Sequence, residues 1–207
     1  MRFLRRPKRS SRSIAVFCGA FHPPTVAHVA LARAAREVVD EVVWVMPEKF
    51  PHKSYDGVAL PARLRMVLES TADAVALSRE NLFFSVAGEM EEALPGRAVQ
   101  LLIGEDGARR IVEWDYGLDA NGHAEYLESN LKKYPVLSAR RKEQWAIPEE
   151  LAAYFGWLEV ETAMEAISST EVRQRIASGG DWEAMVPEGS RRLVSRLYGS
   201  VGMVRGQ

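Results

Sequence analysis

The sequence predicts a doubly wound α/β fold with a mostly parallel sheet in a single domain, and three observations support this prediction. Short runs of apolar and β-branched residues alternate with longer segments whose apolar residues recur at helical spacing. The chain has 207 residues, of which 47% are hydrophobic, and this is enough to bury one core. The sequence also contains no internal repeat that would indicate a different architecture.

The expected elements follow from these patterns in chain order. The strands, each a short apolar run, are expected at residues 13–18, 41–46, 82–86, 98–103, 134–138 and 157–160. The helices are expected at residues 25–39, 59–76, 108–113, 169–178 and 187–197, with residues 104–107 leading from a strand into the third of them. Residues 115–133 are rich in Gly and Asp, so we expect a loop there before a short helix. In this Rossmann-like arrangement, ligands bind at the carboxyl ends of the strands.

The two ends of the chain are expected to lie outside the domain, which would span residues 13–199. Residues 1–12 carry six basic side chains and no acidic one, and they are expected to be a disordered tail. Contact of this tail with RNA or lipid is the alternative. The apolar run 14–21 that follows has eight residues and ends in a phosphate loop, so a signal peptide is rejected. Residues 200–207 are expected to be a C-terminal tail.

Composition excludes several classes of protein. The single cysteine, Cys18, excludes a disulfide framework and a cysteine-based zinc site, and it fits a reducing cytoplasm. No apolar run approaches the roughly 20 residues that cross a bilayer, so no membrane partner is expected. The formal net charge of −1 gives the chain as a whole no nucleic-acid-binding character.

The first expected strand runs into a candidate phosphate loop over residues 19–28. Gly19 permits a tight turn where the backbone approaches a phosphate, and two prolines stiffen the loop ahead of the helix. Thr25 and His28 are three residues apart, so they share one face of the first helical turn. The dipole and unbonded amides of a helix N-terminus favour an anion there. The pattern is neither the dinucleotide Gly-x-Gly-x-x-Gly nor the Walker loop.

A second candidate phosphate site lies in residues 167–173. Ser168 and Glu171 have capping-box spacing, which predicts a helix start. Ser169 and Thr170 offer hydroxyls and amides at that start, and Arg173 can bind phosphate oxygens in a fork. The two segments would then place two helix N-termini against one triphosphate.

Both segments resemble signatures of the nucleotidylyltransferase superfamily. Residues 19–28 are similar to its Gly-x-Phe-x-Pro-x-(His/Thr)-x-Gly-His motif, and residues 167–173 to its Ile-Ser-Ser-Thr-x-x-Arg motif. Further matches resemble bacterial nicotinate-nucleotide adenylyltransferases and run in the right order from about Ile14 to Tyr198. They are Pro51-His-Lys53 with Arg63 and Met66, Leu102-Ile-Gly-Glu-Asp106 with Trp114, and Met185-Val-Pro187.

The chain departs from the family pattern at three places. Ala27 stands where the motif has Gly before the second histidine, and His22 stands where an acidic or amide residue precedes the proline. Residues 138–142 occupy the stretch where the family carries Arg-Pro-Gly.

The resemblance implies adenylyl transfer from ATP to nicotinate mononucleotide, giving the dinucleotide and pyrophosphate in NAD biosynthesis. The implied partners are ATP and a pyridine mononucleotide, and the implied cofactor is Mg²⁺ bound mainly through ATP phosphates rather than by protein ligands. The catalytic residues would be His28, Thr25, Lys53 and Arg173, and Trp114 and Lys53 would bind the acceptor. The ATP-binding residues would be Gly19, Phe21, His22, Gly104, Asp106, Ser168, Ser169 and Thr170.

Simpler interpretations remain open at several of these positions. Asp106 is also a plausible helix cap, Trp114 a core or interface aromatic, and Lys53 a solvated loop charge. Pantetheine phosphate, or an alcohol phosphate in a cytidylyl transfer, is an alternative acceptor. A diverged regulator that binds a nucleotide without catalysis is the alternative outside enzymes.

Overall fold

The computed structural model describes residues 1–49, 58–139, 145–164 and 166–202, and it confirms the predicted fold class. Its strands are β1 Arg2–Arg5, β2 Ser13–Cys18, β3 Glu41–Pro47, β4 Ala74–Ser78, β5 Ala98–Gly104, β6 Val136–Ala139 and β7 Phe155–Leu158. Its α-helices are α1 Val26–Ala35, α2 Leu60–Ser70, α3 Phe83–Ala93, α4 Glu105–Glu113, α5 Ala120–Lys133, α6 Ser169–Ser178 and α7 Glu188–Gly202. Three short 3₁₀ turns lie at Glu149–Tyr154, Thr162–Met164 and Glu183–Met185.

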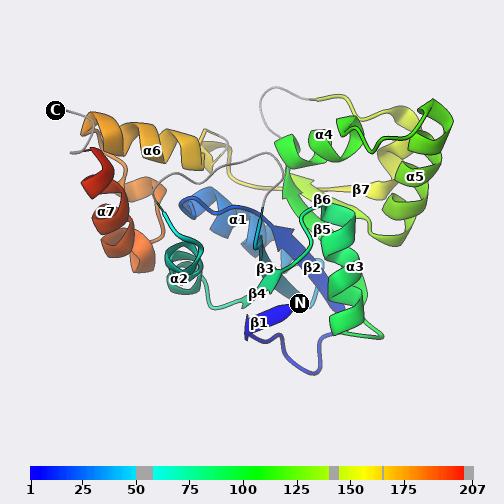
Figure 1. Cartoon of the computed structure of the whole chain (residues 1–207), viewed down its shortest axis with the longest axis horizontal. Coiled ribbons are helices and arrows are strands. Elements are labelled where there is room, and N and C mark those ends of the chain that lie inside the picture. The colour runs from blue at the N-terminus through cyan, green and yellow to red at the C-terminus, as the bar shows by residue number, and fades with distance from the viewer. Residues whose placement is uncertain (50–57, 140–144, 165, 203–207) are drawn as a thin grey trace.

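The strands form one sheet in the order β1-β4-β3-β2-β5-β6-β7, with helices around it (Figure 1). Every pair is parallel except β1 with β4. From β2 the chain proceeds through β3 and β4 on one side, and it then returns to the other side through β5, β6 and β7. The strand order therefore reverses between β2 and β5. In a doubly wound sheet this switch point is where a crevice for ligands opens at the carboxyl ends of the strands.

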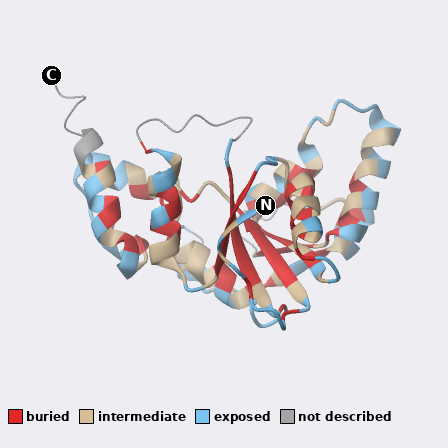
Figure 2. Cartoon of the chain, turned by 60° about the horizontal axis from the view of Figure 1, so that its bottom comes forward, coloured by how far each residue is buried: buried red, intermediate tan, exposed pale blue. Residues whose placement is uncertain are grey.

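Side chains alternate between the two faces of the sheet, and a separate apolar core lies on each face (Figure 2). In β2, Ile14 and Val16 pack toward α3, α4 and α5, whereas Ala15 and Phe17 pack toward α1 and α2. A third cluster joins the outer side of α2 to α6 and α7. This third cluster places α6 beside α2 and α7, although α6 lies far along the chain from α2.

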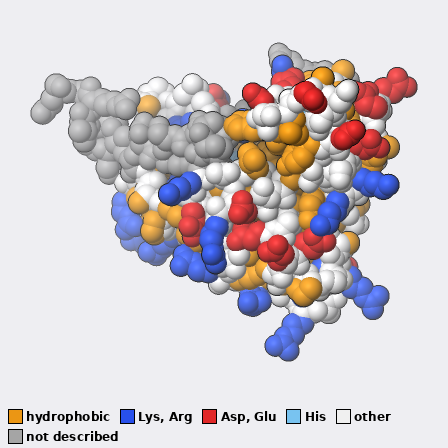
Figure 3. Space-filling model, turned by 45° about the vertical axis from the view of Figure 1, so that its right-hand side comes forward, with side chains coloured by type: hydrophobic (Ala, Val, Ile, Leu, Met, Phe, Trp, Pro, Cys, Tyr) orange, Lys and Arg blue, Asp and Glu red, His pale blue; other side chains and the backbone are white. Residues whose placement is uncertain are grey.

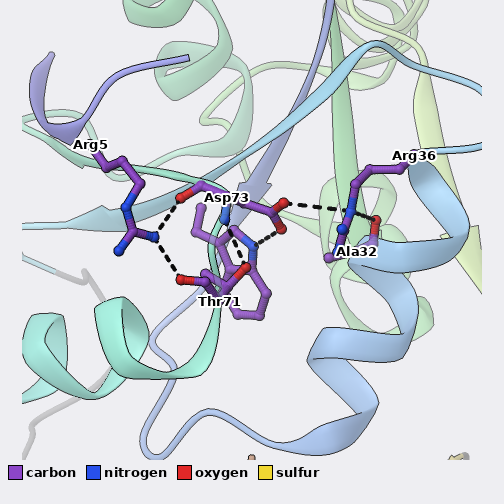
Figure 4. A network of polar contacts seen from close by, with 6 residues as sticks. Arg5, Ala32, Arg36, Thr71 and Asp73 are labelled. Carbon is purple, nitrogen blue, oxygen red and sulfur yellow. Dashed lines mark hydrogen bonds and ion pairs between the residues drawn. The ribbon is translucent and has the colours of Figure 1, made fainter. Parts of the chain in front are cut away.

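The expectation that residues 1–12 form a disordered tail is wrong. Residues 2–5 form the edge strand β1, which pairs antiparallel with β4. The Arg5 guanidinium donates to the backbone oxygens of Thr71 at 2.6 Å and Asp73 at 2.9 Å, just beyond the end of α2 (Figure 4). These carbonyls follow the last turn of a helix, where a cationic donor is favourable. At the other end of the chain, α7 continues to Gly202, beyond the expected boundary at 199.

Three further elements differ from the prediction. Residues 82–86, expected as a strand, begin α3, because the apolar pattern continues at helical spacing through the buried Met90. The helix expected over 59–76 ends at Ser70; Thr71 is extended, and the buried run 74–78 is β4. The segment 115–133, expected to be mainly loop, contains the 14-residue α5, whose N-cap Asp119 accepts from the Gly122 amide. Among the described residues, no helix is long and apolar enough to cross a membrane.

Candidate nucleotide-binding site

A cavity of about 660 Å³ opens at the switch point, beyond the carboxyl ends of β2 and β5. Every site residue that the sequence predicts lines it, except Lys53, which lies outside the described residues together with Pro51 and His52. The residues brought together are Gly19, Phe21, His22, Thr25, His28, Gly104, Asp106, Trp114, Ser168, Ser169, Thr170 and Arg173. Segments that are about 150 residues apart in the sequence therefore share one wall.

The phosphate loop is shaped around the ring of Phe21. This ring is 2% exposed, and its centroid lies 4.8 Å from that of Trp44 and 5.3 Å from that of His28. Phe21 has a φ of 45°, which costs a non-glycine residue roughly 1–2 kcal/mol. A Cβ on Gly19 would approach the Phe21 ring to 2.9 Å. Gly19 is therefore needed because it leaves room for this ring, which is a different reason from the expected tight turn.

Thr25 and His28 form a reciprocal cap at the start of α1. The Thr25 amide donates to His28 Nδ1 at 3.0 Å, and the Thr25 hydroxyl lies 2.7 Å from the same nitrogen. In return, the Thr25 hydroxyl accepts from the His28 amide at 3.4 Å. Because an amide can only donate, Nδ1 is the acceptor of the neutral ring, and its hydrogen is on Nε2. The buried Thr25 therefore orients His28 so that Nε2–H is the donor of the imidazole.

The second motif holds the loop from the other side. Ser168 caps α6 by accepting from the Glu171 amide at 3.1 Å, as its spacing predicts. The Ser169 hydroxyl donates to the backbone oxygen of Pro23 at 2.8 Å, and Arg173 Nη1 donates to that of His22 at 2.5 Å. The two predicted motifs are therefore joined by direct hydrogen bonds. Arg173 also donates through Nη2 to the Thr170 hydroxyl at 3.2 Å, which fixes its guanidinium along the wall.

Buried polar groups lie behind the loop, on α2 and α7. The His22 ring lies 5.2 Å from the ring of Tyr198 on α7, which is 7% exposed. Burial raises the pKa of Tyr198, although the nearby charges of Arg173 and Arg63 act in the opposite direction. Arg63 is itself only 3% exposed. Two cationic side chains, Arg63 and Arg173, therefore lie near the phenol ring that packs against His22.

Four helices begin at the cavity. The N-cap residues of α1, α3, α4 and α6 all line it, and they are Thr25, Leu82, Gly104 and Ser168. The N-cap residues of α3 and α4 make no side-chain hydrogen bond to their helices. Each helix N-terminus carries the equivalent of about half a positive charge. Together the four helix N-termini make the cavity suited to polyanionic ligands.

The opposite wall is aromatic and was largely missed by the sequence prediction. Phe83, Arg110 and Tyr116 line the cavity together with the predicted Trp114. The Tyr116 hydroxyl donates to the backbone oxygen of Ile111 at 3.0 Å, and burial raises the pKa of this phenol. Figure 3 looks toward the side of the molecule that carries α3 to α5, where hydrophobic side chains gather in a patch. No local signal in the sequence singles out Arg110, because Arg109 beside it carries the same charge.

Cys18 also lines the cavity, and its protonation state limits the chemistry. Burial raises the pKa of its thiol to about 12, so the thiol is protonated at neutral pH. Because the thiolate is the nucleophilic form, Cys18 is unsuited to covalent catalysis.

Comparison with known proteins connects this geometry to a family. A family profile described as cytidylyltransferase-like matches residues 16–175, more than half of the chain. A protein of Exiguobacterium sibiricum named "Probable nicotinate-nucleotide adenylyltransferase" is 28% identical over 192 residues, covering 87% of this chain and 95% of its own. One of the same name from Gloeobacter violaceus is 28% identical over 200 residues, covering 89% and 93%.

Solved structures give the same fold. The nicotinic acid mononucleotide adenylyltransferase of Plasmodium falciparum, complexed with NaAD, matches with a TM-score of 0.66 and 16% identity. The match covers 89% of this chain and 95% of that one. At this identity, the likeness establishes the fold alone.

Proposed function

The chain belongs to the cytidylyltransferase-like family, and from this premise we propose that it transfers the AMP unit of ATP to nicotinate mononucleotide. The products would be pyrophosphate and the dinucleotide that precedes NAD. The observation that carries the proposal is the cavity at the switch point, where both phosphate-binding segments face Trp114. The names of the two bacterial relatives agree with this acceptor. The single cysteine, buried as a thiol, is compatible with a reducing cytoplasm as the place of the reaction.

The reaction needs no nucleophile from the protein. An oxygen of the acceptor phosphate, already ionised at neutral pH, attacks the α-phosphorus of ATP. A P–O bond forms there as the bond between the α-phosphorus and its bridging oxygen breaks, and that oxygen leaves with pyrophosphate. Catalysis then consists of positioning the two substrates and stabilising the charge that develops on the leaving group.

The chain's own residues divide these tasks. His28 Nε2–H donates to oxygens of the α- and β-phosphates, while Thr25 holds the ring in that tautomer. Arg173 binds the triphosphate and keeps its contact with the loop carbonyl of His22, so that loop and substrate are fixed together. Backbone groups at Gly19, Phe21 and Gly104 and the hydroxyls at Ser169 and Thr170 complete the ATP side, with Asp106 and His22 beside them. Lys53 would approach the acceptor phosphate or the leaving pyrophosphate.

Mg²⁺ fits this site as an ion carried by the substrate. On the described part of the wall, Asp106 is the only carboxylate. The described residues also contain no group of three or more His, Cys, Asp or Glu side chains placed to hold a metal. Mg²⁺ retains several waters and binds through few protein ligands, so phosphate oxygens would supply most of its coordination. When bound, the ion neutralises charge on the triphosphate.

Pyrophosphate release with a panel of substrates tests the proposal. We expect release from ATP with nicotinate mononucleotide, at a kcat/KM at least about tenfold above that with nicotinamide mononucleotide, or roughly 1.4 kcal/mol. Preference for the nicotinamide form would overturn the acceptor and leave adenylyl transfer intact. Release only with pantetheine phosphate, or only from CTP with an alcohol phosphate, would assign another reaction of the same type. Tight ATP binding without any pyrophosphate release would favour a regulator.

A further inference from the structure

The acceptor in the proposed reaction has two anionic groups that must bind in different parts of the cavity. Its phosphate must meet the α-phosphorus of ATP, and therefore lies beside the phosphate loop and the start of α6. Its ring carboxylate is separated from that phosphate by the ribose and lies near the surface that receives the pyridine ring. Groups that hold the triphosphate, such as His28 and Arg173, are therefore not the ones that would neutralise the carboxylate. A separate group that binds the carboxylate is therefore expected on the other wall.

Arg110 is in that position. Gly107, Arg110 and Ile111 line the cavity from one face of α4, and Trp114, the C-cap residue of this helix, also lines it. Arg110 lies four residues before Trp114, at the separation where side chains along a helix are neighbours. Gly107 has no side chain to occupy the space one turn earlier. On the described part of the cavity wall, Arg110 and Arg173 are the only lysine or arginine side chains.

We propose that Arg110 is a specificity-determining residue whose guanidinium binds the ring carboxylate of the acceptor, an inference that rests on the proposed function. A guanidinium presents parallel N–H donors that match the two oxygens of a carboxylate. The rings of Phe83, Trp114 and Tyr116 line the same cavity, and apolar surroundings strengthen a charge-assisted hydrogen bond. A carboxamide offers one oxygen and an NH₂ group, so one donor of the fork would face another donor. Arg110 therefore favours the acid over the amide.

The neighbouring Arg109 provides a matched control. Its Nε donates to both carboxylate oxygens of Glu113, at 2.8 and 2.9 Å, and its side chain is 60% exposed. Arg109 does not line the cavity. The two arginines thus lie in the same helix with the same charge, and only one of them faces the proposed acceptor.

The test compares Arg110→Ala, Arg110→Gln, Arg110→Lys and Arg109→Ala with the unsubstituted chain, at saturating ATP, using nicotinate and nicotinamide mononucleotides. We expect Arg110→Ala to lower kcat/KM for the nicotinate form at least about tenfold and to leave the nicotinamide form within about twofold. Arg110→Lys should retain part of the preference, because a point charge lacks the fork. Arg109→Ala should change neither value. Arg110→Gln keeps most of the side-chain length without the charge. It therefore replaces Arg110→Ala in the comparison of kcat/KM if the alanine variant has a lowered melting temperature.

Three results would overturn the inference. Equal losses for the two mononucleotides would mean that Arg110 binds a group they share, or that it only supports α4. The unsubstituted chain is expected to prefer the nicotinate form over the nicotinamide form. If Arg110→Gln kept the same preference, the role of Arg110 would be contradicted and the proposed function would stay intact. No turnover of either mononucleotide by the unsubstituted chain would instead contradict the proposed function, and the inference with it.

Discussion

The two walls of the cavity are built in different ways. The phosphate wall, made by residues 19–28 and α6, is held by hydrogen bonds that end on backbone atoms, such as Arg173 to the His22 carbonyl and Ser169 to the Pro23 carbonyl. The aromatic wall, made by the start of α3, the face of α4 and the residues that follow it, is lined by the side chains of Phe83, Arg110, Trp114 and Tyr116. In the proposed function, the first wall would recognise groups common to all nucleotides, and the second would recognise what distinguishes one acceptor from another.

This difference predicts where substitutions act. Changes on the phosphate wall should impair ATP use and turnover for every acceptor, because all acceptors share the triphosphate chemistry. Changes on the aromatic wall should alter the acceptor KM and the choice of acceptor, while ATP binding is preserved. Substitutions at His28, Arg173 and Trp114 test this separation, with expected effects that decrease in that order.

His28→Ala should give the largest effect, lowering kcat by at least about 100-fold, as when one donor that stabilises developing charge is removed. His28 also completes the cap of α1, so the melting temperature should fall by only a few degrees. Steady-state kinetics with ATP and nicotinate mononucleotide, together with thermal melting, provide the measurement. Near-normal turnover would contradict the role of Nε2–H, and a collapse of stability would make His28 primarily structural.

Arg173→Ala should come next, raising the KM for ATP by about 10- to 100-fold, the range for losing hydrogen bonds from a charged group. The KM for the acceptor should change much less. Arg173→Lys should recover part of the loss, because lysine restores charge without the fork. Arg175→Ala is the control on the same helix, since Arg175 Nε pairs with Glu171 Oε1 at 2.7 Å and does not line the cavity. An equal increase in the KM for ATP and the KM for the acceptor would mean that the two walls act as one functional unit.

The same contrast explains how much could be predicted from the sequence. The ends of β2 and α6 were predicted at the residues where the structure places them, because a short β-branched run and a capping-box spacing are local signals. The phosphate motifs also predicted the family, which the profile match over residues 16–175 confirms. The caps that Thr25 and His28 form on α1, and Ser168 on α6, depend on local spacing, so a short motif predicts each helix start on this wall.

The aromatic wall was harder to predict because it depends on tertiary packing. Phe83 was assigned to a strand, since the apolar run 82–86 fits either a strand or a helix until its neighbours are known. Arg110 was overlooked because nothing in its local sequence distinguishes it from Arg109; only the face of α4 that packs toward the cavity does so. The strand β1 was missed for a similar reason, because Arg5 is fixed by carbonyls more than 60 residues away.

Trp114→Ala should have the smallest effect and is the most direct test of the separation between the walls. Loss of a stacked ring costs about 0.5–1.5 kcal/mol beyond area burial, so the KM for nicotinate mononucleotide should rise by roughly two- to tenfold. Trp114→Phe should keep most of the affinity, because a flat apolar surface remains. The KM for ATP should stay within about twofold in both variants, as measured with the acceptor saturating.

Combining Trp114→Ala with Arg110→Ala sharpens the same test. Arg110 in α4 and Trp114 at its C-cap both line the cavity and would contact one pyridine ring, so their effects on nicotinate mononucleotide should be coupled rather than additive. Trp114→Ala and Arg173→Ala, from opposite walls, should instead add. If Trp114→Ala raised the KM for ATP as much as that for the acceptor, Trp114 would support the cavity as a whole. The phosphate and aromatic walls would then be one recognition surface, and acceptor choice would have to arise from the positions of both substrates together.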